Sequence, residues 1–458
     1  MTFRLALRAL TSRPIRSAVL ACGFGFGIAV MAALLGVGEV ILDQAEAPAL
    51  RGGGDLLVTG INGKLESARF VSSSVLGTAP LADRTAASSP TLGGRLYLVT
   101  EKGTVPVSAR GGIPSLERAI GDPETASVAA WADAPGDARW SSPDPGDVLR
   151  ALDRFHPVPD SPRATSWAEW LYFNGRAGET KFYLTFLFGP KNDRGNRLAG
   201  VRLQLDRGGK LTNYTDTSEV SEDQLLASAP DVTIGRCSVR LEGRRYRIAL
   251  SFPGLTGDLA IDAEPGRSMA PVVLHGADNW VSGYVVPVLS GKLAGALRTG
   301  GDTLSFDGGT GYHDHNWGFW EGVSWQWGQV AGDGISIVYG RVRPPADVAD
   351  PARIPGFLGV LGPNGPESFS TRVTIDETDD PSADRPEHIV VEARGEALEL
   401  RMEIDVESAV RTPWTPGASG GPLDALSLVQ MRATYRVDGR IGGRTVSFTA
   451  AGSAETFR

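Results

Sequence analysis

Cysteine is scarce in this chain of 458 residues, which has only two, Cys22 and Cys237. Cys22 lies in an apolar stretch and Cys237 far along the chain, so we expect no disulfide between them and a fold held by its own core. Positive charge is in the minority, with 45 Lys and Arg against 53 Asp and Glu and a net charge of −8. This balance argues against nucleic-acid binding. The sequence also has no phosphate-binding glycine loop, no G-x-S-x-G and no Cys–His nucleophile signature.

The sequence has one uncharged apolar stretch that is long enough to span a bilayer, residues 17–38. As a helix this stretch extends about 33 Å, which is enough for the hydrocarbon core. Four arginines precede it and three acidic residues follow it closely, which places the N-terminus in the cytoplasm and the bulk of the chain outside. We therefore expect a single-pass anchor in the cytoplasmic membrane. A cleaved signal peptide is the alternative, because Ala45, Glu46 and Ala47 form a small-x-small site.

This N-terminal region resembles the first transmembrane segment of ABC permeases of the lipoprotein-release and macrolide-export type. The resemblance is carried by RLALRALTSRPIRSAVLACGFGFGIAVMAALLGVGEVILDQ at residues 4–44 and GGDLLVTG at residues 53–60. It implies a place beside ABC permease subunits. No later stretch matches the further helices of such permeases, so the resemblance does not imply transport by this chain alone.

Residues 1–46 are thus assigned to the basic segment and anchor, and residues 47–155 to a small mixed extracytoplasmic module or stalk. Two short helices are predicted in the module, at residues 115–120 and 147–155. The second has an apolar stripe at helical spacing, formed by Val148, Leu149, Leu152 and Phe155.

From residue 156 the pattern changes to short alternating runs with turn residues every eight to twelve positions. Such spacing is typical of antiparallel sandwiches and barrels, so we predict an all-β fold here. A turn-rich seam near residues 282–291 divides it into two tandem barrels, residues 156–288 and 289–458. Closed barrels of about eight strands have room inside for one small ligand.

Several motifs of this β-rich region resemble the hydroxyneurosporene synthase family, also called carotenoid hydratases, which has two lipocalin-like domains. The motifs are SWAEWLYFNG at residues 166–175, GYVVP at 283–287, GTGYHDHNWG at 309–318, WQWG at 325–328 and GSAETF at 452–457. The wider superfamily includes lipocalin-like proteins encoded beside ABC exporters and fungal enzymes that fold polyenes for Diels–Alder cyclisation. All three branches handle long apolar molecules.

The resemblance implies a binding site for a long apolar ligand, such as a lipid or a polyene. The motif residues that we expect to line it are Trp170, Tyr172, Tyr284, His313, His315, Trp317, Trp325 and Trp327. One departure separates this chain from the hydratases, which have His-x-Trp before the proline of the strand leading into the second barrel. Here residues 283–287 contain neither a histidine nor a tryptophan.

The motif at residues 309–328 holds four of the ten tryptophans and two of the five histidines. Read as a strand, it places Tyr312, Asp314 and Asn316 on one face, and His313, His315 and Trp317 on the other. An apolar pocket keeps a carboxylic acid neutral, and aromatic faces stabilise a carbocation by about 2 kcal/mol. We therefore name Asp314 and Tyr312 as candidate catalytic residues. The alternative is structural, with Asp314 bonded to a turn and the tryptophans plugging the barrel base.

His313 and His315 could also be considered as metal ligands, because both point to the same face. Zinc needs a third protein ligand, and no other His or Cys lies close to them in the sequence. We expect neither a metal nor a cofactor.

Two classes of function remain. The first is a membrane-anchored extracytoplasmic lipocalin-like protein that binds an apolar ligand as an accessory to an ABC-type exporter. The second is a hydro-lyase of the carotenoid hydratase type, which adds water to a terminal double bond by acid catalysis. The departure at residues 283–287 and the permease-like anchor favour the first class.

Overall fold

The computed structural model describes residues 14–15, 53–59, 65, 67–77, 81–101, 103–126, 130–228, 230–264, 266–380, 385–413 and 427–457. The chain forms two compact units. One contains the described residues of Met1–Glu66 together with Ala87–Asp137, and the other contains Ser67–Ala86 and Ala138–Arg458. No helix among the described residues is both long and apolar enough to cross a membrane. The predicted anchor at residues 17–38 lies outside the described residues and stays a prediction.

The first unit is built on a hairpin of β1 (Thr91–Thr100) and β2 (Gly103–Gly112), followed by α4 (Pro114–Ala119) and α5 (Pro123–Ala126). Arg110 of β2 forms ion pairs with Glu117 of α4 and with Asp122, which precedes α5. These pairs tie the hairpin to the helices. Helix α4 confirms the helix predicted at residues 115–120.

Helix α7 (Pro145–Leu152) belongs to the second unit and confirms the other predicted helix. It begins at Asp144, whose carboxylate accepts hydrogen bonds from the first free backbone N–H groups of the helix, and at a proline, which suits that position. The four residues of the predicted apolar stripe are all buried in the core of the first barrel. This helix is therefore part of the barrel unit, whereas we had assigned it to the preceding module.

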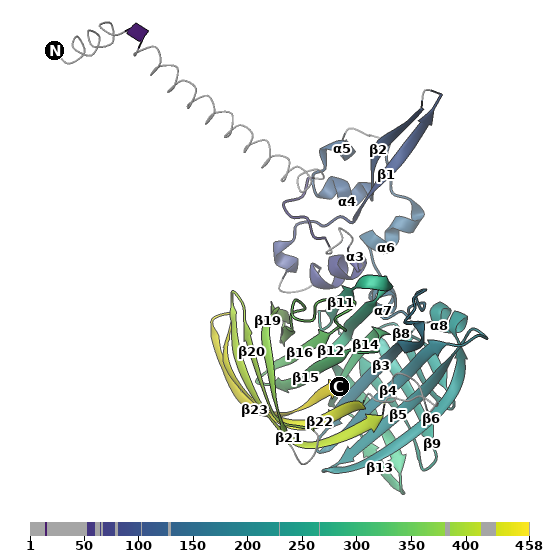
Figure 1. Cartoon of the computed structure of the whole chain (residues 1–458), viewed down its shortest axis with the longest axis vertical. Helices are drawn as coiled ribbons and strands as arrows, with labels where there is room; N and C mark the ends of the chain where they lie inside the picture. Colours follow the sequence, from purple (N-terminus) through teal and green to yellow (C-terminus); the bar gives the residue numbers. More distant parts are fainter. Residues whose placement is uncertain are drawn as a thin grey trace, which may run out of the picture. The chain divides into compact units, whose positions relative to one another are not determined.

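Barrel 1 is a nearly closed antiparallel barrel of twelve strands (Figure 1). Its main strand order is β6-β5-β4-β3-β14-β12-β10-β9-β8-β7. At the two ends of this order, the backbone N–H of Gly235 after β7 donates a 3.2 Å hydrogen bond to Ser218 Oγ of β6, which brings the edges together. The strands are β3 (Trp167–Ala177), β4 (Thr180–Lys191), β5 (Asn196–Arg207), β6 (Lys210–Ser221), β7 (Val232–Ile234), β8 (Cys237–Glu242), β9 (Arg245–Phe252), β10 (Leu255–Asp262), β11 (Met269–His275), β12 (Val281–Thr299), β13 (Asp302–Ser305) and β14 (Gly309–Phe319).

Barrel 2 is a strongly curved half-barrel of nine strands in the order β18-β17-β16-β15-β23-β22-β21-β20-β19 (Figure 1). The strands are β15 (Ser324–Gly332), β16 (Ile335–Arg343), β17 (Phe357–Gly362), β18 (Gly365–Ser370), β19 (Arg372–Asp380), β20 (Arg385–Arg394), β21 (Leu398–Pro413), β22 (Ser427–Ile441) and β23 (Arg444–Phe457). The predicted fold class, all-β with two tandem lipocalin-like barrels, is confirmed.

The division between the barrels differs from the one that the turn-rich residues indicated. Strand β12 runs without interruption across the expected boundary at 288/289, and the motif strand β14 pairs with β3 and β12 inside barrel 1. Pro287 lies where the register of β12 against β14 shifts between Val285 and Val288. A bulge tolerates a residue without an N–H, so this proline does not end the strand.

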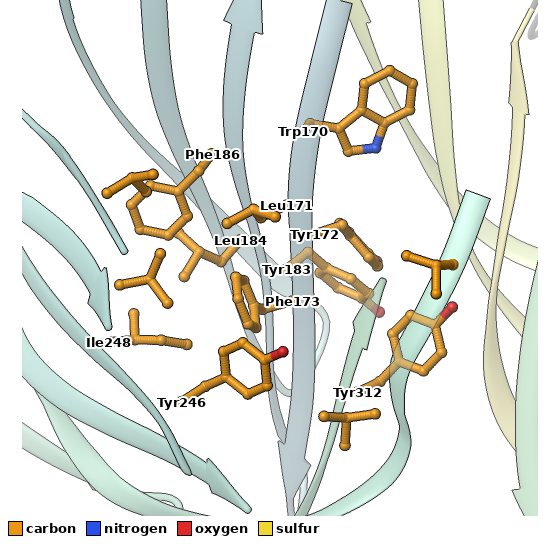
Figure 2. Packing of buried hydrophobic residues seen from close by; sticks show 14 of the residues in the cluster. Trp170, Leu171, Tyr172, Phe173, Tyr183, Leu184, Phe186, Tyr246, Ile248 and Tyr312 are labelled. Carbon is orange, nitrogen blue, oxygen red and sulfur yellow. The ribbon is translucent and has the colours of Figure 1, made fainter. Parts of the chain in front are cut away.

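Side chains of β3 alternate between two different packing environments. Figure 2 shows Leu171 and Phe173 on one side of the strand with Tyr246 and Ile248 of β9, and Trp170 and Tyr172 on the other side. The first group fills the interior of barrel 1 with aliphatic and aromatic groups. The second group faces barrel 2, so both faces of this sheet are buried.

Candidate functional site

Strand β14 lies between β3 and β12 and shows the alternation that its sequence predicted. Asp314 is opposite Tyr172 of β3, and His313 is opposite Phe173 of β3 and Val288 of β12. The Asp314 face turns toward barrel 2, and the His313 face turns into barrel 1. A single strand thus supplies polar groups to two separate sites.

On the face toward barrel 2, four residues form a continuous chain of hydrogen bonds. Trp327 Nε1 of β15 donates to the hydroxyl of Tyr284 on β12 at 3.0 Å. The hydroxyls of Tyr284 and Tyr312 are 2.8 Å apart, and Tyr312 donates to Asp314 Oδ2 at 2.8 Å. Asn316 Nδ2 donates to the other oxygen, Oδ1, at 2.8 Å. We call Trp327, Tyr284, Tyr312 and Asp314 the tyrosine–aspartate chain.

Burial makes the Asp314 end of this chain an acid. The side chain is almost completely buried, and this desolvation, together with the charge of Glu455, raises the pKa of Asp314 well above its usual value. The hydrogen bonds from Tyr312 and Asn316 lower the pKa, but burial outweighs them. Among the described residues, no Lys or Arg forms an ion pair with Asp314. The raised pKa favours the protonated form of Asp314 over that of an exposed aspartate, and this form has a proton to donate.

Aromatic side chains from both barrels surround this chain. Trp170 of β3 stacks on Trp325 of β15 with ring centroids 5.7 Å apart, and Trp325 stacks on Phe457 of β23 at 4.1 Å. Tyr172 lies edge-on to Trp327 at 6.0 Å. Five of the residues named from the sequence as ligand-binding, Trp170, Tyr172, Tyr284, Trp325 and Trp327, therefore meet where the barrels touch.

A small pocket opens beside Tyr172, between β3 to β6 of barrel 1 and β21 to β23 of barrel 2, and its volume is about 20 Å³. We call it the seam pocket. Glu455 lines it, and burial raises the pKa of Glu455 to about 7, although Gln430 and Tyr172 hydrogen-bond to the carboxylate. Gln204 also lines it, and its buried Nε2 has no hydrogen-bond partner in the described part of the chain. The pocket therefore has a titratable acid and a free donor.

The opposite face of β14 carries a second buried polar group inside barrel 1. His313 Nε2 lies 2.9 Å from Asp153 Oδ2, and His315 Nδ1 lies 2.9 Å from Asp153 Oδ1. Tyr246 of β9 donates to Asp153 Oδ2 at 2.7 Å. Asp153 follows helix α7, so these bonds fasten the end of the helix to the barrel. Two residues named as ligand-binding, His313 and His315, are thus separated from Asp314 by the sheet itself.

Glu169 of β3 extends this network toward the barrel rim. Its Oε1 accepts from His315 Nε2 at 3.1 Å, and its Oε2 accepts from Arg197 at 2.9 Å. Arg197 also binds Glu222 at 2.6 Å. Hydrogen bonds to Asp153 and Glu169 raise the pKa of His315 to about 9 against the effect of burial, and bonds from the histidines lower the pKa of Glu169 to about 2. The network is a chain of alternating charges.

His156, Glu169 and His315 are the one group among the described residues whose donor atoms could converge on a metal ion. These atoms lie within 4.8 Å of one another. They are already hydrogen-bonded together, and His156 also stacks on Trp317 with ring centroids 4.0 Å apart. A protonated His315 and the buried Arg197 guanidinium both oppose a further cation. We therefore read the group as an ion-pair network.

Sequence reasoning missed several residues of these sites, among them Asp153, Glu169, Gln204 and Glu455. Glu169 and Glu455 lie within two of the motifs that carried the family resemblance, so the motifs marked their positions without indicating their roles. Asp153 and Gln204 lie outside every motif, and only the fold brings them to the sites.

No family model matches the chain, and no curated protein matches it. Among solved structures, a Nitrosomonas europaea protein described as AttH is 17% identical, with 66% of this chain and 99% of that chain covered and a TM-score of 0.44. CghA solved with Sch210972 is 13% identical, with 67% of this chain and 94% of that chain covered and a TM-score of 0.46. CghA solved alone is 14% identical, with 66% of this chain and 93% of that chain covered and a TM-score of 0.44. The assignment to tandem lipocalin-like barrels rests on the strand pairing described above.

Proposed function

We propose that this chain is a binding protein for an apolar ligand that carries a hydrogen-bond acceptor, and that the polar end of the ligand lies in the seam pocket. The observation that carries this proposal is the free Nε2 donor of Gln204, buried in the pocket wall together with Glu455. A buried donor without a partner destabilises a protein by about 1–3 kcal/mol, and an acceptor on a ligand would remove that penalty.

Part of the remaining wall is apolar and suits a ligand with an apolar body, beside polar residues that include Asp206 and Arg432. Tyr172, Tyr183, Val410 and Met431 contribute apolar surface to the pocket, and beyond Tyr172 lies the tyrosine–aspartate chain. Binding sites for small molecules commonly combine apolar walls with a few convergent polar groups. A long lipid or polyene would place only its polar end among these residues, because the empty space is small.

The test uses the full-length protein in a nonionic detergent. Mass spectrometry of co-purified lipids identifies a natural ligand, and displacement of a dansyl-labelled long-chain fatty acid measures affinity. Gln204→Met should weaken binding by about tenfold, since it removes the donor and keeps the side-chain volume. The matched control is Gln224→Met, on the exposed surface of helix α8 (Glu222–Ser228). Absence of saturable displacement, or equal losses in the two variants, would overturn the proposal.

The second candidate is an acid-catalysed hydratase. The observation that favours it is a pair of buried acids with raised pKa, Asp314 and Glu455, joined to tyrosines that can relay a proton. Hydration of an isolated double bond needs a strong proton donor and then an environment that tolerates a carbocation. Incubation with an acyclic isoprenoid that has a terminal double bond tests it, and formation of a tertiary alcohol that Asp314→Asn abolishes would support it.

We further propose that the protein acts on the outer face of the cytoplasmic membrane, anchored through residues 17–38, beside ABC permease subunits. The sequence features behind this proposal are the basic N-terminal segment and its resemblance to the first permease helix. Reporter fusions after Gly60 should be active only with an extracytoplasmic reporter. A cytoplasmic signal there would contradict the proposed topology. Failure to recover permease subunits after crosslinking in membranes would contradict the proposed partnership.

A further inference from the structure

A second and larger pocket, with a volume of about 630 Å³, lies at one end of the barrel 2 strands. Three strand ends meet there: Arg341 near the end of β16, Arg372 at the start of β19 and Arg394 at the end of β20. The segment before β17 completes the wall and contributes Arg353. We call this site the arginine pocket, defined by Arg341, Arg353, Arg372 and Arg394.

Positive charge in the arginine pocket is not balanced by the protein. Glu392 is the one acidic residue in its lining, and that carboxylate forms an ion pair with Arg401. In the described part of the chain, none of the four arginines of the pocket forms an ion pair. This concentration of positive charge occurs in a chain with a net charge of −8. The amino-acid composition of the chain, which is acidic, therefore does not explain why four arginines line this pocket.

The strand register places two of these arginines side by side, both exposed, so that solvent only partly screens their repulsion. Arg372 and Arg394 are direct partners in the antiparallel pair of β19 and β20. Like charges directly opposite each other destabilise a sheet, whereas an anion between them would reverse the sign of the interaction.

Arg341 adds an unsatisfied donor. Its Nε is buried and has no hydrogen-bond partner among the described residues, and one terminal nitrogen reaches the Pro351 carbonyl only at 3.4 Å. Burial and the neighbouring charge of Arg343 lower the pKa of Arg341. An acceptor in the pocket would satisfy this guanidinium.

We propose that the arginine pocket binds a phosphate-bearing anion. Arginine presents a planar fork of donors that matches phosphate oxygens in pairs. A phosphate ester carries about −1.5 to −2 charges at neutral pH, which suits several guanidiniums better than the single charge of a carboxylate. Thr371 and Thr374, which also line the pocket, offer hydroxyl donors for the remaining oxygens. The phosphate belongs either to a soluble compound or to a lipid headgroup.

The experiment is calorimetric titration of inorganic pyrophosphate into the full-length protein in a nonionic detergent at low salt. The double variant Arg372→Gln/Arg394→Gln should bind at least about tenfold more weakly. Arg298→Gln removes one charge from an exposed position on β12 of barrel 1, outside the pocket, and should change affinity less than about twofold. The double variant relieves a like-charge pair, so its melting temperature should not fall.

Saturable binding that is lost in the double variant and kept in Arg298→Gln supports the proposal. No saturable binding by the unmodified protein, equal affinity in the double variant, or an equal loss in Arg298→Gln would overturn it. Arg353→Gln gives an independent test if the double variant fails to fold, and it too should weaken binding. Short-chain phosphatidic acid compared with glycerol phosphate then distinguishes the source: tighter binding of the lipid indicates a headgroup, and equal binding indicates a soluble phosphate compound.

Discussion

The hydroxyl groups of Tyr284 and Tyr312 lie 2.8 Å apart and join strands β12 and β14 on the face that barrel 1 turns to barrel 2. Trp327 of barrel 2 donates to the first of these hydroxyls, and Asp314 accepts from the second. The contact between the barrels is therefore polar at its centre and aromatic around it. Such an arrangement favours the neutral form of a buried acid.

Asp314→Asn should leave the fold intact. As pH rises, the stability of this variant should increase relative to that of the unmodified protein. The pKa of Asp314 is raised in the folded state, so its contribution to stability is fully present below its usual value of 3.8 and is lost as pH rises through the raised pKa. Asparagine has a similar shape but does not titrate, so the variant loses no stability in this way as pH rises. Urea unfolding at a series of pH values measures this difference. A variant that aggregates, or that loses stability relative to the unmodified protein at high pH, would show that the carboxyl group itself is structural.

His315→Gln should destabilise the protein by about 3 kcal/mol, because it removes the cation between two buried carboxylates. The pKa of His315 is raised from 6.5 to about 9, so its contribution is fully present below pH 6.5 and is lost as pH rises through about 9. The difference between the variant and the unmodified protein should shrink over that range. Chemical unfolding at several pH values tests this expectation.

The matched control for this prediction is His388→Gln in barrel 2. His388 Nδ1 also lies 2.8 Å from a carboxylate, that of Asp405, but both side chains are partly exposed. An ion pair in contact with water contributes about 0–1 kcal/mol to stability, so His388→Gln should destabilise the protein far less than His315→Gln. Equal losses in the two variants would mean that the buried network contributes no more than a surface ion pair.

The sequence predicted much of the fold and only part of the site. Alternation along residues 309–319 was enough to place Asp314 and His313 on opposite faces, because side chains of any strand alternate. The turn-like residues 282–291 were misleading, since Pro287 sits at a bulge in a long strand. Contacts such as Asp153 with His313 join residues that are 160 positions apart, and no local pattern encodes such a pairing.

Gln204→Met should raise the free energy of unfolding of the ligand-free protein by about 1 kcal/mol. The Nε2 atom of Gln204 is buried without a hydrogen-bond partner among the described residues, so its removal relieves a desolvation penalty. Thermal unfolding after delipidation measures the effect. The same variant should lose stabilisation by added ligand, because a ligand that binds only the folded state stabilises it in proportion to its affinity. A loss of stability without ligand would indicate that the amide already has a partner, such as a bound water.

Gly283→Ala should destabilise barrel 1 by about 1–3 kcal/mol, the usual effect of overpacking a core. A Cβ at this position of β12 would lie 2.0 Å from the buried ring of Trp317 on β14, the residue directly opposite in the strand pair. Trp317 is itself held by stacking on His156, so it has little room to move.

Gly200→Ala on β5 is the matched control, because a Cβ there meets nothing closer than 3.8 Å. Both glycines lie in extended strands, so both substitutions reduce the freedom of the unfolded chain equally. Urea unfolding should therefore show a loss for Gly283→Ala and no loss for Gly200→Ala. If Gly283→Ala is as stable as the control, the indole of Trp317 shifts readily, and close packing is not the reason for a glycine in the GYVVP motif.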